Sequence, residues 1–282
     1  MTLMSEDLWQ RLQKRPVWVT VHSCFRQSLN LMCGGDMITL LSRGKCLQPS
    51  SVLLDYTAFF DTWRLPEEPM LLSKQGLSWN GELRLPFAQL KIRSVRLQNQ
   101  SCVALRYADQ IKEFLTGKKK GICGLVEDRT DDVYTQFLQP RIQVFRQAVL
   151  DGDQERIRTC VQNVAGCGQG LTPSSDDFLC GYMSEFPQNH QNRQLCSTIT
   201  SAACKKTNDI SAALLRYAER GLYSVDILGL FSAFHLGSHI AVELLLKRVA
   251  EFGSSSGCDY LTGMYFGILD SNKKEGFNVG KA

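Results

Sequence analysis

Several features that mark common protein classes are missing from this sequence of 282 residues. It contains only four histidines and no C-x-x-C pair, which disfavours a zinc ribbon and a thioredoxin-type redox site. Its eleven cysteines are odd in number and scattered, often within apolar runs, so a disulfide scaffold is not expected. We therefore predict reduced thiols, as in a cytoplasmic protein.

Long apolar stretches and a strong charge imbalance are absent as well. No uninterrupted apolar run approaches the roughly 20 residues of a membrane helix, and the first residues, MTLMSEDLWQRLQKRP, lack the apolar core of a secretory signal. The 32 basic and 28 acidic residues leave a net charge of +4, which is too small and too dispersed to indicate nucleic-acid binding. We expect a soluble, cytoplasmic protein that binds neither a membrane nor nucleic acid.

The one basic run is Lys118–Lys120, and the acidic residues Glu127, Asp128, Asp131 and Asp132 follow it. We interpret this run as a solvated loop, because clusters of like charge usually lie in water. A phosphate-binding patch is the alternative.

Hydrophobic periodicity predicts an α+β fold. Up to about residue 105, apolar residues occur in short alternating or β-branched runs separated by Gly, Pro and Asn, which is typical of strands. The predicted strands are VWVTVHSCF, MITLLS, SVLL, GELRLPF, LKIRSVRL and SCVAL, with hairpin turns at CGGD (33–36) and WNGE (79–82). After Arg106, apolar residues recur at helical intervals. We predict a β-rich domain over 1–105, as a sheet or small barrel, and a larger, mostly helical domain over 106–282.

The most informative stretch is GCGQGLTPSSDDFLCGYM, from Gly166 to Met183. Glycines let a backbone turn its amides toward a ligand, and a helix N-terminus adds a partial positive charge, so this junction is suited to an anion. We expect the amides near Gly168, Gly170 and Leu171 to cradle a phosphate or carboxylate. The hydroxyls available to bond its oxygens are those of Thr172, Ser174 and Ser175.

A similar motif recurs near the C-terminus. Asp177-Phe178-Leu179-Cys180-Gly181 resembles Asp259-Tyr260-Leu261-Thr262-Gly263, and the second copy follows the serine-rich loop Ser254–Gly257. Both aspartates are predicted at the start of a helix, and the glycines, with Gly267, would let the two helices approach closely. We predict one composite site covered by both loops, with Ser255, Ser256 and Gly257 among its binding residues. Two ordinary helix caps with packing glycines are the alternative.

Three aspartates and one arginine are the candidate catalytic residues. Asp176, Asp177 and Asp259 have two candidate roles: to orient a donor group of the substrate, or to hold a divalent cation such as Mg²⁺ that bridges phosphate oxygens. Arg216 is the candidate counter-charge for an anion. Its alternative is a helix-surface arginine that faces Glu219.

Other motifs are weaker. His235, His239 and Glu243 have the spacing of metal ligands on one helix, but Gly237 interrupts the segment, so a helix is expected to end near His235 and another to begin near Ser238. The G-x-S-x-G string at 253–257 follows a helical pattern, whereas a nucleophile elbow follows a strand. The glycine loop is neither a Walker A nor a dinucleotide-binding motif, and its cysteine has no neighbouring histidine to activate it. We assign no metal ligands.

The patterns GxGxGLTPSxDDxLxG, SxxxLRYAxxG and G-x-[ST]-SG-x-D resemble those of the bacterial AllH family, and Arg26–Met32 extends the likeness into the β-rich part. The resemblance implies a subunit of an oxamate carbamoyltransferase of anaerobic allantoin breakdown, with AllF-type and AllG-type partner subunits. The implied reaction interconverts oxalurate plus phosphate with oxamate plus carbamoyl phosphate, all of them small anions. Ser254 replaces a histidine common in the family, so an acid or base role of that histidine is not expected here.

Two other functions remain open from the sequence. The chain could be a free-standing small-molecule transferase or hydrolase, which activity without partners would indicate. It could instead be a non-catalytic assembly or regulatory subunit, and melting that does not respond to phosphate would indicate this alternative.

Overall fold

A computed structural model describes residues 1–98, 102–186 and 190–279 of the chain. Two compact units make up the structure: residues 1–96 with 222–228, and residues 97–221 with 229–282. The short segment 222–228 joins the first unit through backbone hydrogen bonds. Tyr223 N donates to Val95 O at 2.8 Å, and Val225 N donates to Leu47 O at 3.1 Å.

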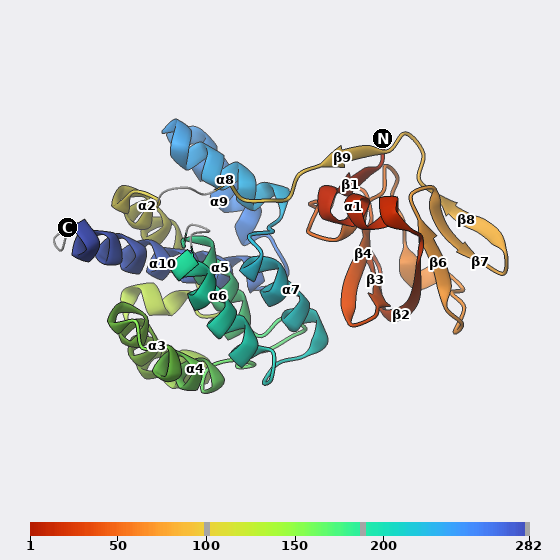
Figure 1. The fold of residues 1–282 in the computed structure, drawn as a ribbon. Coiled ribbons are helices and arrows are strands. Elements are labelled where there is room, and N and C mark those ends of the chain that lie inside the picture. The colour runs from red at the N-terminus through yellow and green to blue at the C-terminus, as the bar shows by residue number, and fades with distance from the viewer. Residues whose placement is uncertain (99–101, 187–189, 280–282) are drawn as a thin grey trace. The chain divides into compact units, whose positions relative to one another are not determined.

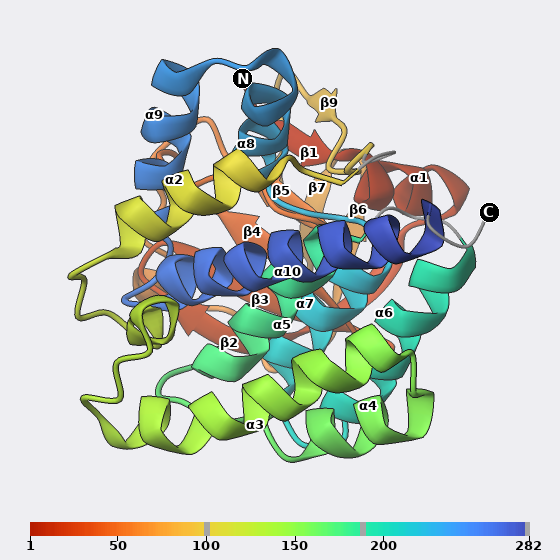
Figure 2. The same cartoon turned by 90° about the vertical axis from the view of Figure 1, so that its left-hand side faces the viewer.

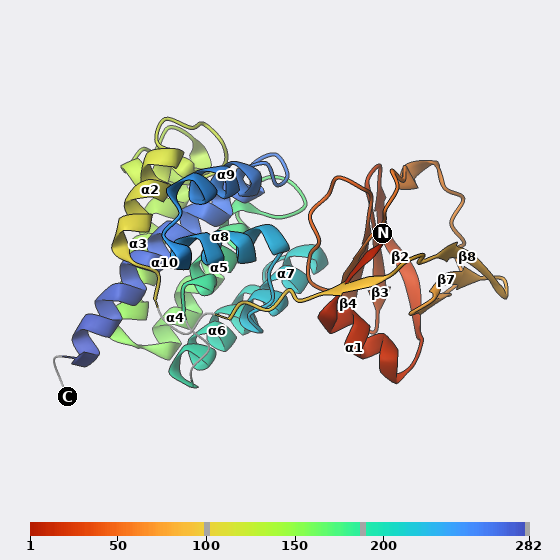
Figure 3. The same ribbon diagram turned by 90° about the horizontal axis from the view of Figure 1, so that it is seen from above.

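The first unit is built on a nine-stranded sheet of order β8-β7-β6-β2-β3-β4-β5-β1-β9 (Figure 1). Its neighbouring strands are antiparallel except for the parallel pairs β4–β5 and β1–β9. The strands are β1 Leu3–Ser5, β2 Val17–Phe25, β3 Ser28–Cys33, β4 Asp36–Leu41, β5 Ser51–Leu53, β6 Met70–Ser73, β7 Gly76–Trp79, β8 Glu82–Pro86 and β9 Lys91–Arg93. Figure 3 shows the adjacent strands β2, β3 and β4 from above.

Both predicted hairpin turns are confirmed. Gly34 and Gly35 join β3 to β4, and Asn80 and Gly81 join β7 to β8, all four with positive φ. Two-residue hairpin turns of type I′ need positive φ at both positions, and Gly and Asn adopt positive φ at the lowest energetic cost.

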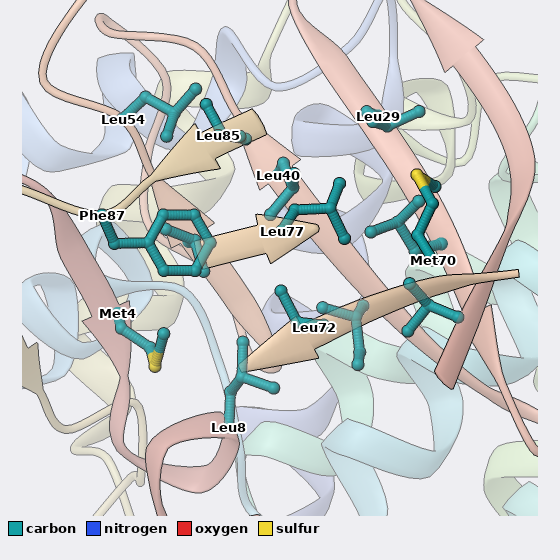
Figure 4. Close-up of a cluster of buried hydrophobic side chains, with 14 of the residues drawn as sticks. Met4, Leu8, Leu29, Leu40, Leu54, Met70, Leu72, Leu77, Leu85 and Phe87 are labelled. Atoms are coloured by element: carbon teal, nitrogen blue, oxygen red, sulfur yellow. The ribbon is translucent and has the colours of Figure 1, made fainter. Parts of the chain in front are cut away.

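The core of this unit forms where α1 (Glu6–Lys14) covers the sheet. Leu8 and Leu12 of α1 pack with inward-facing strand residues, and Figure 4 shows Leu8 with Met4, Leu72 and their neighbours. The burial of these side chains from water is the main stabilising contribution here. A short 3₁₀ helix, η1 (Phe60–Thr62), adds the buried Phe60 to the same core.

The second unit is helical. Figure 2 shows α10 running across it, with α5 against α10, α2 along one side and α3 along the other. Its elements are α2 Leu105–Leu115, η2 Cys123–Glu127, α3 Val133–Asp151, α4 Gln154–Gln162, α5 Ser174–Ser184, α6 His190–Ala203, α7 Asp209–Glu219, α9 His239–Ala250 and α10 Ser256–Val279, and α8 (Val225–Leu236) begins in the first unit and ends in the second. Side-chain caps at Asp132, Asn208 and Ser238 start α3, α7 and α9.

The predicted α+β class, with a β-rich part followed by a larger helical part, is confirmed. The strand predicted at SCVAL is wrong in its described residues, since 102–104 are irregular and Leu105 begins α2; Ser101 lies outside the described residues. The helix α2 has a buried apolar stripe, made of Tyr107, Ala108, Ile111 and Leu115. Burial of this stripe favours a helix that begins at Leu105, although the residues before it prefer a strand. None of the helices within 1–98, 102–186 and 190–279 is long and apolar enough to cross a membrane.

A buried glutamate at the end of α5 gives a stability prediction. Glu185 is fully buried, and within the described part of the chain neither of its carboxyl oxygens has a hydrogen-bond partner. Burial raises the pKa of Glu185 well above its ordinary value of 4.5. The native state therefore holds a proton that the unfolded chain releases above pH 4.5, so this group destabilises the fold increasingly as pH rises, until the folded pKa is reached.

We expect Glu185→Gln to raise the melting temperature at pH 8 by several degrees, because the amide has no proton to retain, whereas each unit by which the folded pKa of Glu185 exceeds the unfolded value costs the wild type about 1.4 kcal/mol. At pH 4 the variant and the wild type should melt together. The exposed Glu113 supplies the control, Glu113→Gln. Thermal unfolding at a series of pH values measures the difference, and a wild type that is more stable than Glu185→Gln at pH 8 would contradict the prediction.

Candidate functional site

The two similar motifs meet where α5 and α10 cross. A Cβ added to Gly181 would lie 1.9 Å from Tyr260 O, and one added to Gly263 would lie 1.9 Å from Phe178 O. Each glycine therefore rests on the aromatic residue of the other motif, at a separation that no side chain permits. The predicted close approach of the two helices is confirmed, and Gly267 continues it against Tyr182 O.

This crossing brings the two helix starts and their loops together. Asp177 and Asp259 are the fourth residues of α5 and α10, as the predicted helix starts require. Thr172 Oγ1 and Ser256 Oγ, one from each loop, lie 2.8 Å apart and share a hydrogen bond across 84 residues of sequence. This hydrogen bond joins the two serine-rich loops directly.

Side chains of α5 hold the glycine loop in place. Gly166 N donates to Asp176 Oδ1 at 2.9 Å, and Cys167 N donates to Ser175 Oγ at 2.9 Å. Gly168 has a φ of +135°, and a Cβ there would lie 2.3 Å from Ser174 N, so only glycine fits. Thr207 Oγ1 donates to the second oxygen of Asp176. Asp176 and Ser175 are therefore occupied in fixing the loop.

The tip of this loop keeps its backbone donors available. Within residues 1–98, 102–186 and 190–279, no hydrogen bond is formed by the amide nitrogens of Gly168, Gln169, Gly170 or Leu171. Gly170 and Leu171 are exposed, while Asn208 Nδ2 donates to Leu171 O at 3.0 Å and so holds the loop from its carbonyl side. Four neighbouring N–H groups are thus open to an acceptor.

Asp177 lies beneath both loops with one oxygen unpaired. Its side chain is nearly buried, at 7% exposure, and Oδ2 has no hydrogen-bond partner in the described part of the chain. Burial, followed by the nearby charge of Asp259, raises the pKa of Asp177 well above its ordinary range, and the hydroxyls of Thr172 and Ser256 offset this only in part. The raised pKa favours the protonated form of Asp177, and in that form the carboxyl group can donate a hydrogen bond.

Asp259 serves a different loop. Its Oδ1 accepts a hydrogen bond from Ile122 N at 2.7 Å, while its Oδ2 has no partner among the described residues. Burial raises the pKa of Asp259 to about 6, although the bond from Ile122 and the hydroxyls of Ser174 and Ser255 lower it. This contact with residue 122 was not predicted, because no local pattern links two residues that are 137 positions apart.

The remaining candidate residues have varied surroundings. Ser174 is buried and Ser255 is half-buried, and both hydroxyls face Asp259. Gly257 packs α10 against the end of α9, since a Cβ there would lie 1.8 Å from Val249 O. Arg216 lies on α7 beside Cys204, with Nη1 3.9 Å from Sγ.

The competing motifs have structural settings of their own. His235 belongs to α8 and lies 2.7 Å from Phe231 O, whereas His239 begins α9 and lies 2.5 Å from Gln110 Nε2. The helix break predicted between them is confirmed. The G-x-S-x-G string joins α9 to α10, so it follows a helix and not a strand. Across the described ranges, no three His, Cys, Asp or Glu residues are grouped to hold a metal ion.

Comparison with known families gives two matches that together span both parts of the chain. Residues 1–92 match the AllH family N-terminal domain, and residues 164–268 match the family described as oxamate carbamoyltransferase subunit AllH. The second match contains both loops and all three candidate aspartates. No solved structure matches the chain.

Proposed function

We infer the function from the family: this chain belongs to the AllH family, named for a subunit of oxamate carbamoyltransferase, and we propose that it works as such a subunit. In this proposal it acts with AllF-type and AllG-type partner subunits in the cytoplasm. The complex interconverts oxalurate plus phosphate with oxamate plus carbamoyl phosphate. The two converging loops hold one of these small anions.

The observation that carries the proposal is the junction of the loops. The hydroxyls of Thr172 and Ser256 meet at 2.8 Å, above an Asp177 oxygen that has no partner in the described chain. Four open amides from Gly168 to Leu171 lie in the same loop. Hydroxyl groups, backbone amides and a protonated Asp177 are all hydrogen-bond donors, and an oxyanion is stabilised by such donors.

The reaction gives each of these groups a task. A phosphate oxygen attacks the ureido carbonyl carbon of oxalurate, and the bond from that carbon to the nitrogen of the oxamate part breaks. The electron pair stays on that nitrogen, which takes a proton as oxamate leaves; we assign this proton to Asp177, which regains one from the attacking hydrogen phosphate. The Gly168–Leu171 amides stabilise the oxyanion, and Arg216 is the proposed counter-charge.

The other two aspartates act through the loops that they hold. Asp176 accepts hydrogen bonds from Gly166 and Thr207, and Asp259 accepts one from Ile122. These bonds engage both oxygens of Asp176 and one oxygen of Asp259 with different protein partners, and only Oδ2 of Asp259 is left without one among the described residues. A bridging Mg²⁺ is therefore the less favoured use of these carboxylates.

Thermal shift tests the anion site. Phosphate, carbamoyl phosphate, oxamate or oxalurate should raise the melting temperature of the chain. At a ligand concentration a hundred times the dissociation constant, the free energy of unfolding should increase by about 2.7 kcal/mol. Nucleotides and Mg²⁺ serve as comparison ligands. A Thr172→Val, Ser256→Ala double variant, which keeps the size of both side chains nearly unchanged, should lose the shift.

The same measurements separate the alternatives. Melting that responds to none of the four anions would contradict the anion site and favour a non-catalytic assembly or regulatory subunit. Turnover by the purified chain without partner subunits would favour a free-standing transferase or hydrolase. Turnover that appears only after the partners are added supports the proposal.

A further inference from the structure

We infer that the basic loop, residues Gly117–Ile122, forms a third wall of the same site, and that Lys119 and Lys120 attract the phosphate-bearing substrate to it. The ligand class is a phosphate or acyl phosphate dianion. This inference rests on the proposed function, because it assumes that the two motif loops bind such an anion.

The backbone of the basic loop is attached to the second motif. Asp259 Oδ1 accepts the hydrogen bond from Ile122 N at 2.7 Å in the buried interior. Gly121 lies against the same carboxylate: its φ is +53°, and an added Cβ would reach within 1.9 Å of Asp259 Oδ1. The chain therefore needs glycine at 121 for both conformation and space. A loop that was merely solvated would not need a buried carboxylate of the motif to hold it.

Other contacts fix the start of the loop. Gly117 N donates to Glu127 Oε2 at 2.9 Å, and Arg129 Nη2 donates to Lys118 O at 3.1 Å. Lys118 Nζ lies over the ring of Phe114, 4.3 Å from its centre. The loop is thus held at both ends, and its position relative to the start of α10 is defined.

The positive charges of the two lysines at the tip of the loop are not neutralised by an ion pair within the described residues. Lys119 and Lys120 are exposed, and neither forms an ion pair in the described part of the chain. Their loop influences the start of α10 directly. A hydrogen bond from Cys123 is the main cause of the lowered pKa of the Cys258 thiol, and the positive charges of Lys120 and Lys118 lower it further.

The site needs this positive charge. Asp176, Asp177 and Asp259 are buried in the first turns of α5 and α10, and Asp259, with a pKa of about 6, is largely ionised at pH 7. A dianion would be repelled unless cations compensate. Lys119 and Lys120 are suited to that role, because flexible ammonium groups bind phosphate as point charges without a fixed geometry.

The test compares two double variants of the full chain. Lys119→Gln with Lys120→Gln removes two charges from the basic loop. Arg193→Gln with Lys273→Gln removes two exposed charges elsewhere, and Lys273 lies roughly 25 Å from Ser256 along the axis of α10. Calorimetric titration with inorganic phosphate should show at least about tenfold weaker binding for the first variant and wild-type binding for the second. The loss should be smaller at high salt, where charges are screened.

A second pair of variants tests the attachment. Asp259→Asn keeps an oxygen that can accept the Ile122 hydrogen bond, so phosphate affinity should be retained or increased. Asp259→Ala releases the loop, so affinity should fall and the salt dependence of binding should flatten, as in the lysine variant. If the carboxylate of Asp259 were needed only for its charge, the Asn and Ala variants would have the same phosphate affinity.

The outcomes distinguish the two proposals. If the wild-type chain binds phosphate and the Lys119, Lys120 variant binds it equally well, the inference about the basic loop is wrong and the proposed function stands. If the wild-type chain binds neither phosphate nor carbamoyl phosphate and the assembled complex has no turnover, both are wrong.

Discussion

Replacing Asp177 by Asn in the chain, assembled with its partner subunits, is expected to abolish turnover while the protein stays folded. Asn has the same shape and keeps an oxygen for the hydroxyls near Asp177, but it has no proton to give to the departing nitrogen. Loss of a proton donor costs about 10²–10⁴-fold in kcat. Carbamoyl phosphate formation measures the effect, and melting of the variant measures its fold.

The pH dependence identifies the form of Asp177 that acts. The pKa of Asp177 is raised because the group is buried and lies near Asp259. The neutral acid is the donor, so kcat in the wild type should fall as pH rises through that folded pKa. The residual rate of Asp177→Asn should lack this fall. Asp109 is exposed on α2, and Asp109→Asn should have wild-type kinetics. Normal kinetics in Asp177→Asn itself would remove the assigned role.

Gly263→Ala is expected to give the largest loss of stability. Its new Cβ would lie 1.9 Å from Phe178 O and 2.7 Å from Phe178 C, so backbone must move, and a backbone carbonyl has no rotamer that relieves the contact. We estimate a loss of about 3–5 kcal/mol, or roughly 10 °C in melting temperature. Gly181→Ala meets Tyr260 O at the same 1.9 Å and should lose a similar amount.

A third helical glycine provides the control. Gly229 in α8 faces only the flexible end of Leu245, at 3.2 Å. Ala is the better helix former, so Gly229→Ala should be neutral or stabilising by up to about 1 kcal/mol. Thermal or urea unfolding of the three variants separates crowding at the crossing from helix propensity. If Gly263→Ala melted with Gly229→Ala, the close approach of α5 and α10 would not be a source of stability.

The sequence was informative wherever local chemistry decides the structure. The hairpins at Gly34 and Asn80 and the helix start at Asn208 were predictable, because each depends on residues that are neighbours in the chain. The crossing of α5 with α10 was also predictable, since the repeated spacing of aspartate and glycine marks matching faces of two helices.

Contacts between distant segments could not be predicted. No sequence pattern near Ile122 predicts its hydrogen bond to Asp259. None near Tyr223 predicts its hydrogen bond to Val95. The helix α1 was missed as well, because its nine residues fall within a stretch otherwise dominated by strands. Arg216 was selected because its guanidinium group is a fork-shaped positive charge, and its position beside Cys204 depends on tertiary packing.

Gly181 packs against the second motif and Gly263 packs against the first. These contacts limit how the intervals Asp177–Gly181 and Asp259–Gly263 can vary in length. Four positions along an α-helix complete slightly more than one turn, so each glycine fixes the direction in which the aspartate four positions earlier points. A single residue inserted between them would rotate that carboxylate by about 100° and carry it away from its counterpart. Insertions within either Asp-to-Gly interval should therefore not be tolerated.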